Sequence, residues 1–351
     1  MPITLKDIAE ELNVSVNTVS RALRDMPDIG PETTGLVKET ALRLGYRKNL
    51  AASCLKTAKS MMLGIVVPDI CNPVFSYMYK GIEKVCNETN YTLMLGNSNG
   101  DPEKESAILQ NMLDHGVDGI FLVPGMKDSR VLEQLKSDGI PYVILQRRFP
   151  GIEANIVQSS DYEGGRLAAE HLYELGHRKF LYISAPMYIS SAKERYDGFM
   201  AYLAGQGLPA SAMEVLECDS TRTGGYEAAK KWLWQQAGRE TLRATAILCF
   251  SDYVAYGVYA AIAEAKLRVP EDISVIGYDN NEYSDMTNPA LTTVDIFPYE
   301  IGTRSAEIMF GMLREQGSPS DQENDDSEGF GTHTEEVMLP RLIVRESTGG
   351  N

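Results

Sequence analysis

Near the amino terminus, side chains that can contact the edges of DNA bases follow one another closely. They are Val16, Asn17, Thr18, Ser20 and Arg21. An arginine guanidinium can donate two hydrogen bonds to guanine, an asparagine amide can pair with adenine, and a valine can touch a thymine methyl group. Thr18 and Ser20 suit phosphate contacts, which position a protein without reading sequence. These residue types predict a surface that reads a major groove; the alternative for Arg21 is a solvated surface charge.

Short helices must hold these side chains outward. Apolar residues recur at helical spacing over 3–12, Asn13 tolerates left-handed backbone angles, and Ser15 is placed to cap a second helix. A third helix is expected over 31–44, between a proline and a glycine that favour its two ends. Two helices joined by a tight turn would place the second in the groove. We therefore expect a small all-α helix-turn-helix domain over 1–45.

Charge divides the chain into a nearly neutral head and an acidic body. The 351 residues have a formal net charge of −16, whereas residues 1–60 contain nine basic and seven acidic side chains. Because attraction to phosphates needs local positive charge, contact with DNA is expected from the head alone. The acidity of the body also favours solubility. Five acidic residues lie in 321–328, which we expect to be a solvated loop or a disordered insert.

Composition excludes several other classes. The five cysteines are too scattered for a disulfide framework or a zinc site. No run of about 18 apolar residues exists that could span a membrane, and the early acidic residues interrupt any signal segment. We expect a cytoplasmic, nucleoid-associated protein without a metal or a cofactor.

From Met62 onward, apolar runs alternate with helical patterns. The runs that predict buried strands are 63–67, 91–95, 119–123, 141–145, 180–183, 213–216, 245–249 and 273–277. This alternation predicts α/β lobes with parallel sheets and helices on both faces. We expect a two-lobed core over 61–351. One lobe is expected at about 61–158 and 296–320, and the other at about 159–292 and 330–351.

Four separated motifs resemble the LacI/GalR family of bacterial transcription regulators. They are the run from Leu5 to Arg21, His171-Leu-x-x-Leu-Gly-His177-Arg178, the segment from Leu267 to Asn280, and Pro289-Ala-Leu-Thr-Thr-Val294. One departure is Leu12-Asn13, where the family commonly has Ala-Gly. The resemblance implies a periplasmic-binding-protein-like core behind the helix-turn-helix domain. It also implies a homodimeric DNA-binding regulator, acting as a repressor on a palindromic operator and controlled by a small effector between the lobes.

The segment 46–60 resembles the hinge of this family. It contains basic residues and no acidic ones, and it is too short to remain helical alone. In the family the hinge folds on DNA, and a leucine from each subunit enters the minor groove, which bends the duplex. Leu55 stands at the matching position; the alternative is that Leu55 packs against the core.

The resemblance also implies effector contacts at the carboxyl ends of the strands, where small ligands bind in such sheets. The assigned residues are Phe75, Arg147, Ser191, Arg195, Asp252 and Asp279. Facing carboxylates and guanidinium groups suit a hydroxyl-rich ligand, because each hydroxyl both donates and accepts. The alternatives are that Phe75 belongs to the core, that Asp252 is a helix N-cap, and that Arg195 ties its helix to a neighbouring strand.

The class of effector follows from the same resemblance. The purine-responding branch typically has aromatic residues where this chain has Arg147 and Ser220, so a sugar-like effector is expected. A purine remains an alternative. A sugar phosphate or sugar acid is another, because Arg148, Arg222 and Lys193 add positive charge.

The sequence disfavours two other classes of protein. An enzyme is not expected, because the chain has no nucleophile-elbow motif, no P-loop and no metal-ligand spacing. A glycine-containing segment at 205–210 follows a helical pattern instead of a strand, so we interpret it as a loop. A solute-binding protein would use the same two-lobed core. Such a protein needs an export signal, whereas residues 1–60 provide a DNA-binding unit.

Overall fold

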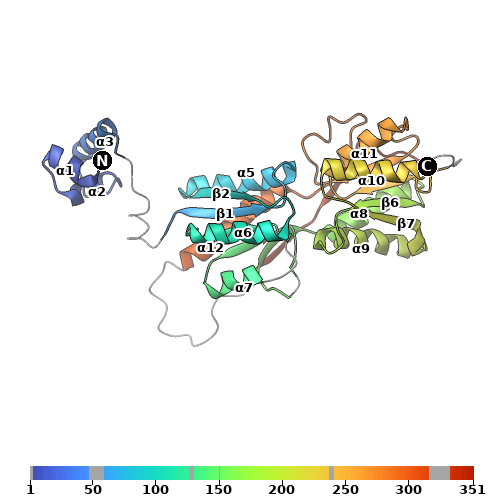
Figure 1. Ribbon diagram of the computed structural model, residues 1–351, viewed down its shortest axis with the longest axis horizontal. Helices are drawn as coiled ribbons and strands as arrows, with labels where there is room; N and C mark the ends of the chain where they lie inside the picture. Colours follow the sequence, from blue (N-terminus) through green and yellow to red (C-terminus); the bar gives the residue numbers. More distant parts are fainter. Residues whose placement is uncertain (1–2, 47–58, 126–129, 150, 237–240, 316–332) are drawn as a thin grey trace. The chain divides into compact units, whose positions relative to one another are not determined.

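The structure, a computed structural model, describes residues 3–46, 59–125, 130–149, 151–236, 241–315 and 333–351. The chain divides into two compact units, residues 1–60 and residues 61–351 (Figure 1). Leu55 and the acidic segment 321–328 lie outside the described residues. No helix in the described ranges is long and apolar enough to cross a membrane.

The N-terminal unit is built from α1 (Leu5–Leu12), α2 (Val16–Ala22) and α3 (Pro31–Leu44). A reciprocal capping box starts α1: the Thr4 hydroxyl accepts from the Asp7 amide, and the Asp7 carboxylate accepts from the Thr4 amide at 2.7 Å. Asn13 ends α1 with a φ of 51°, so the predicted left-handed turn is confirmed. The three helices enclose a core of Ile8, Ala9, Val19, Ala22, Val37 and Ala41.

The first lobe of the core contains a six-stranded parallel sheet in the order β11-β5-β4-β3-β1-β2. Its strands are β1 (Met62–Val67), β2 (Thr92–Asn97), β3 (Ile120–Leu122), β4 (Tyr142–Leu145), β5 (Asn155–Ser159) and β11 (Glu335–Met338). Its helices are α5 (Pro73–Glu88), α6 (Pro102–Asp114), α7 (Arg130–Ser137) and α12 (Pro298–Glu315). Helices α5 and α12 approach closely at Gly81 and Gly302, where an added Cβ would lie 2.2 Å and 2.1 Å from a backbone oxygen of the other helix.

The second lobe repeats this plan with the order β12-β10-β9-β8-β6-β7, in which only the β10–β12 pair is antiparallel. Its strands are β6 (Phe180–Ser184), β7 (Met213–Glu217), β8 (Ala246–Cys249), β9 (Ser274–Tyr278), β10 (Thr292–Asp295) and β12 (Arg341–Ile343). Its helices are α8 (Asp161–Glu174), α9 (Ser190–Gly205), α10 (Arg222–Trp234) and α11 (Asp252–Glu264), with a short 3₁₀ helix at Ala210–Ala212. In Figure 1, α8 and α9 lie on one side of this sheet, and α10 and α11 lie on the other.

The lobe limits differ from the expectation at one point. The segment from 330 onward was assigned to the second lobe, but residues 335–338 form β11, which pairs with β5 in the first lobe. The expected limit is therefore wrong for these residues, and the chain returns to the second lobe only after β11. The physical reason is that β11 is an edge strand with the exposed residues Glu335 and Val337, so it lacks the apolar run that marks a buried strand.

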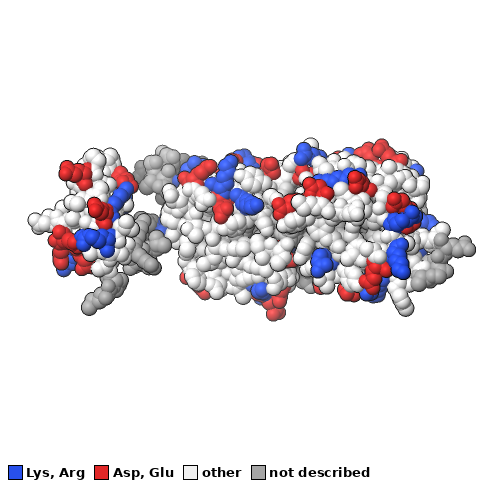
Figure 2. Space-filling view, turned by 90° about the horizontal axis from the view of Figure 1, so that it is seen from above, with Lys and Arg blue, Asp and Glu red and all other residues white. Residues whose placement is uncertain are grey.

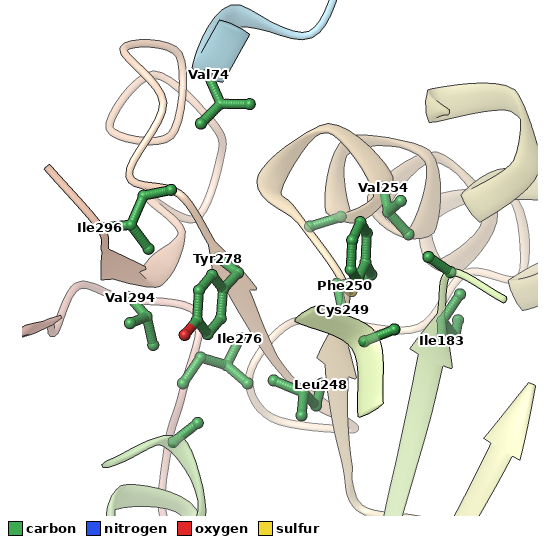
Figure 3. Packing of buried hydrophobic residues seen from close by; sticks show 14 of the residues in the cluster. Val74, Ile183, Leu248, Cys249, Phe250, Val254, Ile276, Tyr278, Val294 and Ile296 are labelled. Carbon is green, nitrogen blue, oxygen red and sulfur yellow. The ribbon is translucent and has the colours of Figure 1, made fainter. Parts of the chain in front are cut away.

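The largest apolar cluster extends over both lobes. Figure 3 shows Tyr278 of β9 beside Ile276 and Val294, with Val74 of α5 and Ile296 in the same cluster. The ends of the strands that were expected to form the ligand site therefore rest on packed, buried side chains.

Two histidines bind the C-terminal segment to the second lobe. The Nε2 atom of His177 lies 3.1 Å from both the Ser274 hydroxyl and the Gly349 carbonyl oxygen. The Nε2 atom of His171 lies 2.8 Å from the Thr348 hydroxyl. Burial lowers the pKa of both imidazoles.

This arrangement predicts that His177 makes unfolding depend on pH. The unfolded chain takes up protons below an ordinary pKa of about 6.5, whereas the folded imidazole resists protonation until a lower pH. The contribution to the free energy of unfolding is therefore present above about pH 6.5 and is lost as the pH falls below it. Urea unfolding of the wild type between pH 7.5 and 5.5 should show a steeper loss than His177→Gln. The exposed His115→Gln should follow the wild type, and equal slopes for all three would refute the assignment.

Candidate DNA-binding and ligand-binding sites

Helix α2 presents two of the predicted DNA contacts to solvent. Val16 is 45% exposed and Asn17 is also exposed, while Val19 and Ala22 are buried on the opposite side of the helix. Thr18, Ser20 and Arg21 are partly exposed. The helix therefore has an inner apolar side and an outer side available to a groove, as helical spacing requires.

Two of the predicted phosphate contacts already have partners within the unit. The Ser15 hydroxyl caps α2 by accepting from the Thr18 amide at 3.0 Å, and it also lies 2.8 Å from the Thr18 hydroxyl. Arg24 donates to the carbonyl oxygen of Ser20 at 3.0 Å and to its hydroxyl at 3.3 Å. Phosphate contacts of Thr18 and Ser20 remain a prediction. A phosphate would share these two hydroxyl groups with their partners Ser15 and Arg24.

Arg21 forms an ion pair with Asp28, with Nη2 at 2.6 Å from Oδ1. Its Nε atom is buried and has no hydrogen-bond partner among the described residues. The hydrogen bond to Asp28 raises the pKa of Arg21, and the same bond lowers the pKa of Asp28. Arg21 must therefore turn away from Asp28, at least in part, before it can hydrogen-bond to a base with both of its outer nitrogens.

Other basic side chains of this unit are also paired with acids. The pairs are Lys6–Glu10, Lys38–Asp25 and Arg43–Glu11. Figure 2 shows acidic and basic side chains interspersed on the face of the helical unit that it presents. Attraction of this unit to phosphate thus depends on individual basic groups that compete with neighbouring carboxylates.

In the core, two hydrogen bonds join the loop after β9 to the first turns of α5. The side-chain Nδ2 of Asn281 donates to the side-chain Oδ1 of Asn72 at 3.4 Å. The Tyr77 hydroxyl donates to the Glu282 carboxylate at 2.7 Å, and this bond raises the pKa of Tyr77 to about 12. Residues at the carboxyl ends of β1 and β9 are therefore in direct contact, although they belong to different lobes.

A further contact between the lobes occurs at the start of α9. Ile189 occupies the N-cap position of this helix, and no side chain caps the first turn, although Ser190 follows directly. The Ser190 hydroxyl instead accepts from the Arg148 amide of the first lobe at 2.9 Å. The Arg148 guanidinium lies 3.9 Å from Glu194 on the same helix.

Arg195 is only 3% exposed and is engaged within the second lobe. Its Nε donates to Asp161 at 2.7 Å, its Nη1 donates to the Phe250 carbonyl oxygen, and its guanidinium lies 3.5 Å from the Tyr278 ring centroid. Burial alone would lower its pKa, but Asp161 and other neighbours raise it overall. Burial raises the pKa of Asp161, and Arg195 opposes that change. This geometry ties α9 to α8 and β8, as the alternative interpretation of Arg195 describes. Contact of Arg195 with an effector stays a prediction.

Asp252 lies among hydrogen-bond donors of its own lobe. Ser251 is the N-cap of α11, so the N-cap alternative for Asp252 is wrong. Its carboxylate is fully buried and accepts from the Asn281 amide at 2.8 Å, the Ser284 hydroxyl at 2.6 Å and the Thr293 hydroxyl at 2.6 Å. Burial raises its pKa to about 6, and these donors oppose the rise. Because both oxygens face donors of the protein, Asp252 holds the loop after β9, and its contact with an effector stays a prediction.

That loop presents Asp279. Asp279 and Asn280 have φ angles of 107° and 52°, and the Asp279 amide donates to the Val294 carbonyl oxygen at 2.8 Å. The Asp279 carboxylate is 4% exposed, and no donor in the described part of the chain hydrogen-bonds to it. Burial raises its pKa well above the ordinary value, and Arg195 opposes this most strongly. A ligand that donates hydrogen bonds would therefore relieve a buried carboxylate that has no partner.

Two neutral side chains also have unsatisfied hydrogen-bonding capacity. Asn281 Oδ1 and Gln146 Nε2 are buried and have no hydrogen-bond partner within the described ranges. Gln146 follows β4 and Asn281 follows β9, so each lobe contributes one at the carboxyl end of its sheet. Asn281 was not among the predicted site residues; the run of polar residues directly after a buried strand was the signal that could have indicated it.

The remaining predicted effector residues are all buried. Phe75 is 8% exposed and packs in the large apolar cluster, as its core alternative describes. Ser191 is 2% exposed and Arg147 is 8% exposed. The structure describes no group of three or more His, Cys, Asp or Glu side chains that could hold a metal ion in the ranges it covers.

Comparison with known proteins agrees with this architecture. Residues 4–49 match the family described as bacterial regulatory proteins, lacI family, and residues 169–348 match the periplasmic binding protein-like domain. Catabolite control protein A of Priestia megaterium is 33% identical over 88% of this chain and 92% of its own length. The HTH-type transcriptional repressor PurR of Pasteurella multocida is 32% identical over 98% of both chains.

Solved structures show the same fold. A LacI family transcriptional regulator from Enterococcus faecium with bound ribose superposes with a TM-score of 0.69 at 28% identity, covering 82% of this chain and 98% of that one. The lac repressor dimer bound to operator and the anti-inducer ONPF gives a TM-score of 0.82 at 25% identity, covering 99% of this chain and all of that one. With relatives of this identity along almost its whole length, the chain belongs to the lacI family of bacterial regulatory proteins.

Proposed function

We propose that this protein is a transcriptional repressor that binds a palindromic operator as a homodimer and is controlled by a small sugar-like effector held between its lobes. The observation that carries the proposal is the lacI-family match over 4–49, which coincides with a helix that exposes Val16 and Asn17 beside Arg21. This match favours a regulator over a solute-binding protein, for which the core alone would serve.

Symmetry supports the homodimer. A pair of identical helix-turn-helix units related by a two-fold axis fits two half-sites of a palindrome. The lac repressor, which shares the fold along nearly the full chain, is a dimer on its operator. Leu55 stays the predicted minor-groove contact of the hinge.

The chemistry between the lobes supports a hydroxyl-rich effector. Asp279 and Asn281 Oδ1 offer acceptors, and Gln146 Nε2 offers a donor, without partners in the described structure. A sugar hydroxyl can donate to one group and accept from another. A purine would be favoured by aromatic stacking surfaces, whereas Phe75 packs in the core and neither Arg147 nor Ser220 is aromatic. A structural relative with bound ribose points the same way.

Coupling would act through the contacts between the lobes. An effector that binds one arrangement of the lobes better than another shifts the population toward it. Asn72–Asn281, Tyr77–Glu282 and Arg148–Ser190 are the hydrogen bonds that such a shift would keep or break. A change in lobe angle would then be transmitted to the paired first lobes and their hinges.

The test separates the two units of the chain. The full-length protein should retard a genomic DNA fragment that it selects from a library, while residues 61–351 should not. Both forms should gain thermal stability with the same sugar, because a ligand at about 100 times its Kd adds about 2.7 kcal/mol to the free energy of unfolding. DNA binding by residues 61–351 alone, or a full-length protein that retards no fragment with or without sugars, would refute the proposal.

A further inference from the structure

The site between the lobes contains one arginine whose charge is not paired. Arg147 follows β4 and is 8% exposed, and its Nη1 donates to the Pro124 carbonyl oxygen at 2.8 Å. No carboxylate in the described part of the chain forms an ion pair with it. Burial lowers its pKa to about 10, and the nearby Glu105 carboxylate opposes the decrease. A buried cation without an ionic contact is costly unless a ligand supplies the opposite charge.

Three of the carboxylates near Arg147 have other partners, and Asp279, whose pKa is raised by burial and lowered by the charge of Arg147, forms no ion pair with it in the described structure. Both oxygens of Glu105 accept from the Gly125 amide, at 3.1 Å and 2.9 Å. Asp161 is paired with Arg195 at 2.7 Å. Glu194 lies beside Arg148 at 3.9 Å. Each of these three acids therefore has a partner other than Arg147.

The start of α9 adds a second anion-attracting feature beside this arginine. This 16-residue helix has no side-chain cap, so the amides of its first turn keep hydrogen-bonding capacity and the positive end of the helix dipole is open. Ser191 in that turn is 2% exposed, and its hydroxyl has no hydrogen-bond partner among the described residues. The Arg148 amide bonds to the neighbouring Ser190, which places the backbone next to Arg147 against this helix end.

We propose that Arg147, Ser191 and the open end of α9 bind the anionic group of the effector, so that the effector is a sugar with a phosphate or carboxylate substituent. This inference rests on the proposed function, because it assigns one end of the proposed sugar site. The hydroxyl groups of the same ligand would donate to Asp279 on the opposite strand end, while its anionic oxygens accept from Arg147. Phosphate and carboxylate share this chemistry, and the test below distinguishes them.

Matched ligands test the proposal on the full-length protein. Thermal shift and calorimetric titration would compare ribose with ribose 5-phosphate, glucose with glucose 6-phosphate and with glucuronate, and inorganic phosphate alone. We expect at least one charged sugar to bind at least tenfold more tightly than its neutral counterpart. Arg147→Gln should remove that advantage by weakening the charged sugar much more than the neutral one, and Arg147→Lys should restore part of it. A response to the phosphate esters only, or to glucuronate only, identifies the substituent.

Control variants keep the result interpretable. Arg178→Gln removes the same charge from an arginine stacked on Tyr173, with its guanidinium 3.7 Å from the ring centroid, and should leave the affinity unchanged. Ser191→Ala should weaken the charged sugar several-fold even where Arg147→Gln folds poorly. Neutral and charged sugars that bind equally, with no effect of Arg147→Gln, would overturn this inference and leave the proposed function intact. Protection by inorganic phosphate that depends on Arg147, without binding of any sugar, would support the anion site and refute the sugar effector. No response to any of these probes would overturn both.

Discussion

Arg21→Ala is expected to weaken binding of the operator by at least about 30-fold. A bidentate arginine–guanine contact contributes about 1–3 kcal/mol of discrimination, and a symmetric dimer loses two of them. The combined loss of about 2–6 kcal/mol corresponds to a roughly 30-fold to 10⁴-fold weaker Kd. Gel retardation with a fragment selected by the wild-type protein would measure it. The thermal shift caused by the effector should be unchanged, because Arg21 belongs to a unit separate from the core.

Two further variants show whether Arg21 contacts a base or only adds positive charge to the DNA-binding unit. Arg43 also pairs with an acid, Glu11, but lies on α3, so Arg43→Ala should weaken binding only a few-fold. Asp28→Asn should strengthen binding several-fold, because it removes a negative charge near the phosphates and releases Arg21 from its 2.6 Å ion pair. Operator affinity that is the same in Arg21→Ala and the wild type would show that Arg21 is the solvated surface charge of the alternative interpretation.

Much of the fold could be predicted because local signals agree with the final structure. Ser15 caps α2, Asn13 takes the left-handed turn, and α3 covers Pro31–Leu44 as expected. In the core, each apolar run that was assigned to a strand coincides with one, since strands that are covered on both faces need continuous apolar sequence.

Strands β5, β10, β11 and β12 were not predicted, and β10 and β11 lack this signal altogether. Strand β10 has the sequence Thr-Thr-Val-Asp and β11 has Glu-Glu-Val-Met, so neither contains an apolar run. They form because neighbouring strands offer them hydrogen bonds, and that depends on tertiary structure. The error in the limit of the second lobe follows from β11 alone.

The candidate site shows a different limit of sequence reasoning. The sequence identifies Asp252, Arg195 and Asp279 as polar residues near strand ends, but it does not say which way each side chain points. Asp252 meets three donors of its own loop and strand, and Arg195 meets Asp161 and two aromatic rings. Asp279, two positions before the Asn281 amide that bonds to Asp252, meets none in the described structure. Only the backbone geometry of the loop after β9 separates these cases.

Asp161→Ala is expected to be the most destabilising single change in the core. Asp161 and Arg195 have side chains that are 2% and 3% exposed, so the substitution leaves a buried guanidinium without its carboxylate. Breaking a buried pair in this way costs about 3–5 kcal/mol of the free energy of unfolding. Urea unfolding followed by circular dichroism would measure the loss.

Comparison with two variants shows whether the cost comes from the unpaired charge. Asp197→Ala removes an exposed carboxylate that pairs with Lys193 on the same helix, and should cost at most about 1 kcal/mol. The double variant Asp161→Leu/Arg195→Met removes both buried charges and should regain most of the stability lost by Asp161→Ala, because uncharged side chains need no partner. If Asp161→Ala were as mild as Asp197→Ala, stacking on Tyr278 and Phe250 would be what holds Arg195 in place. In that case Arg195 could turn toward a ligand without unfolding the lobe.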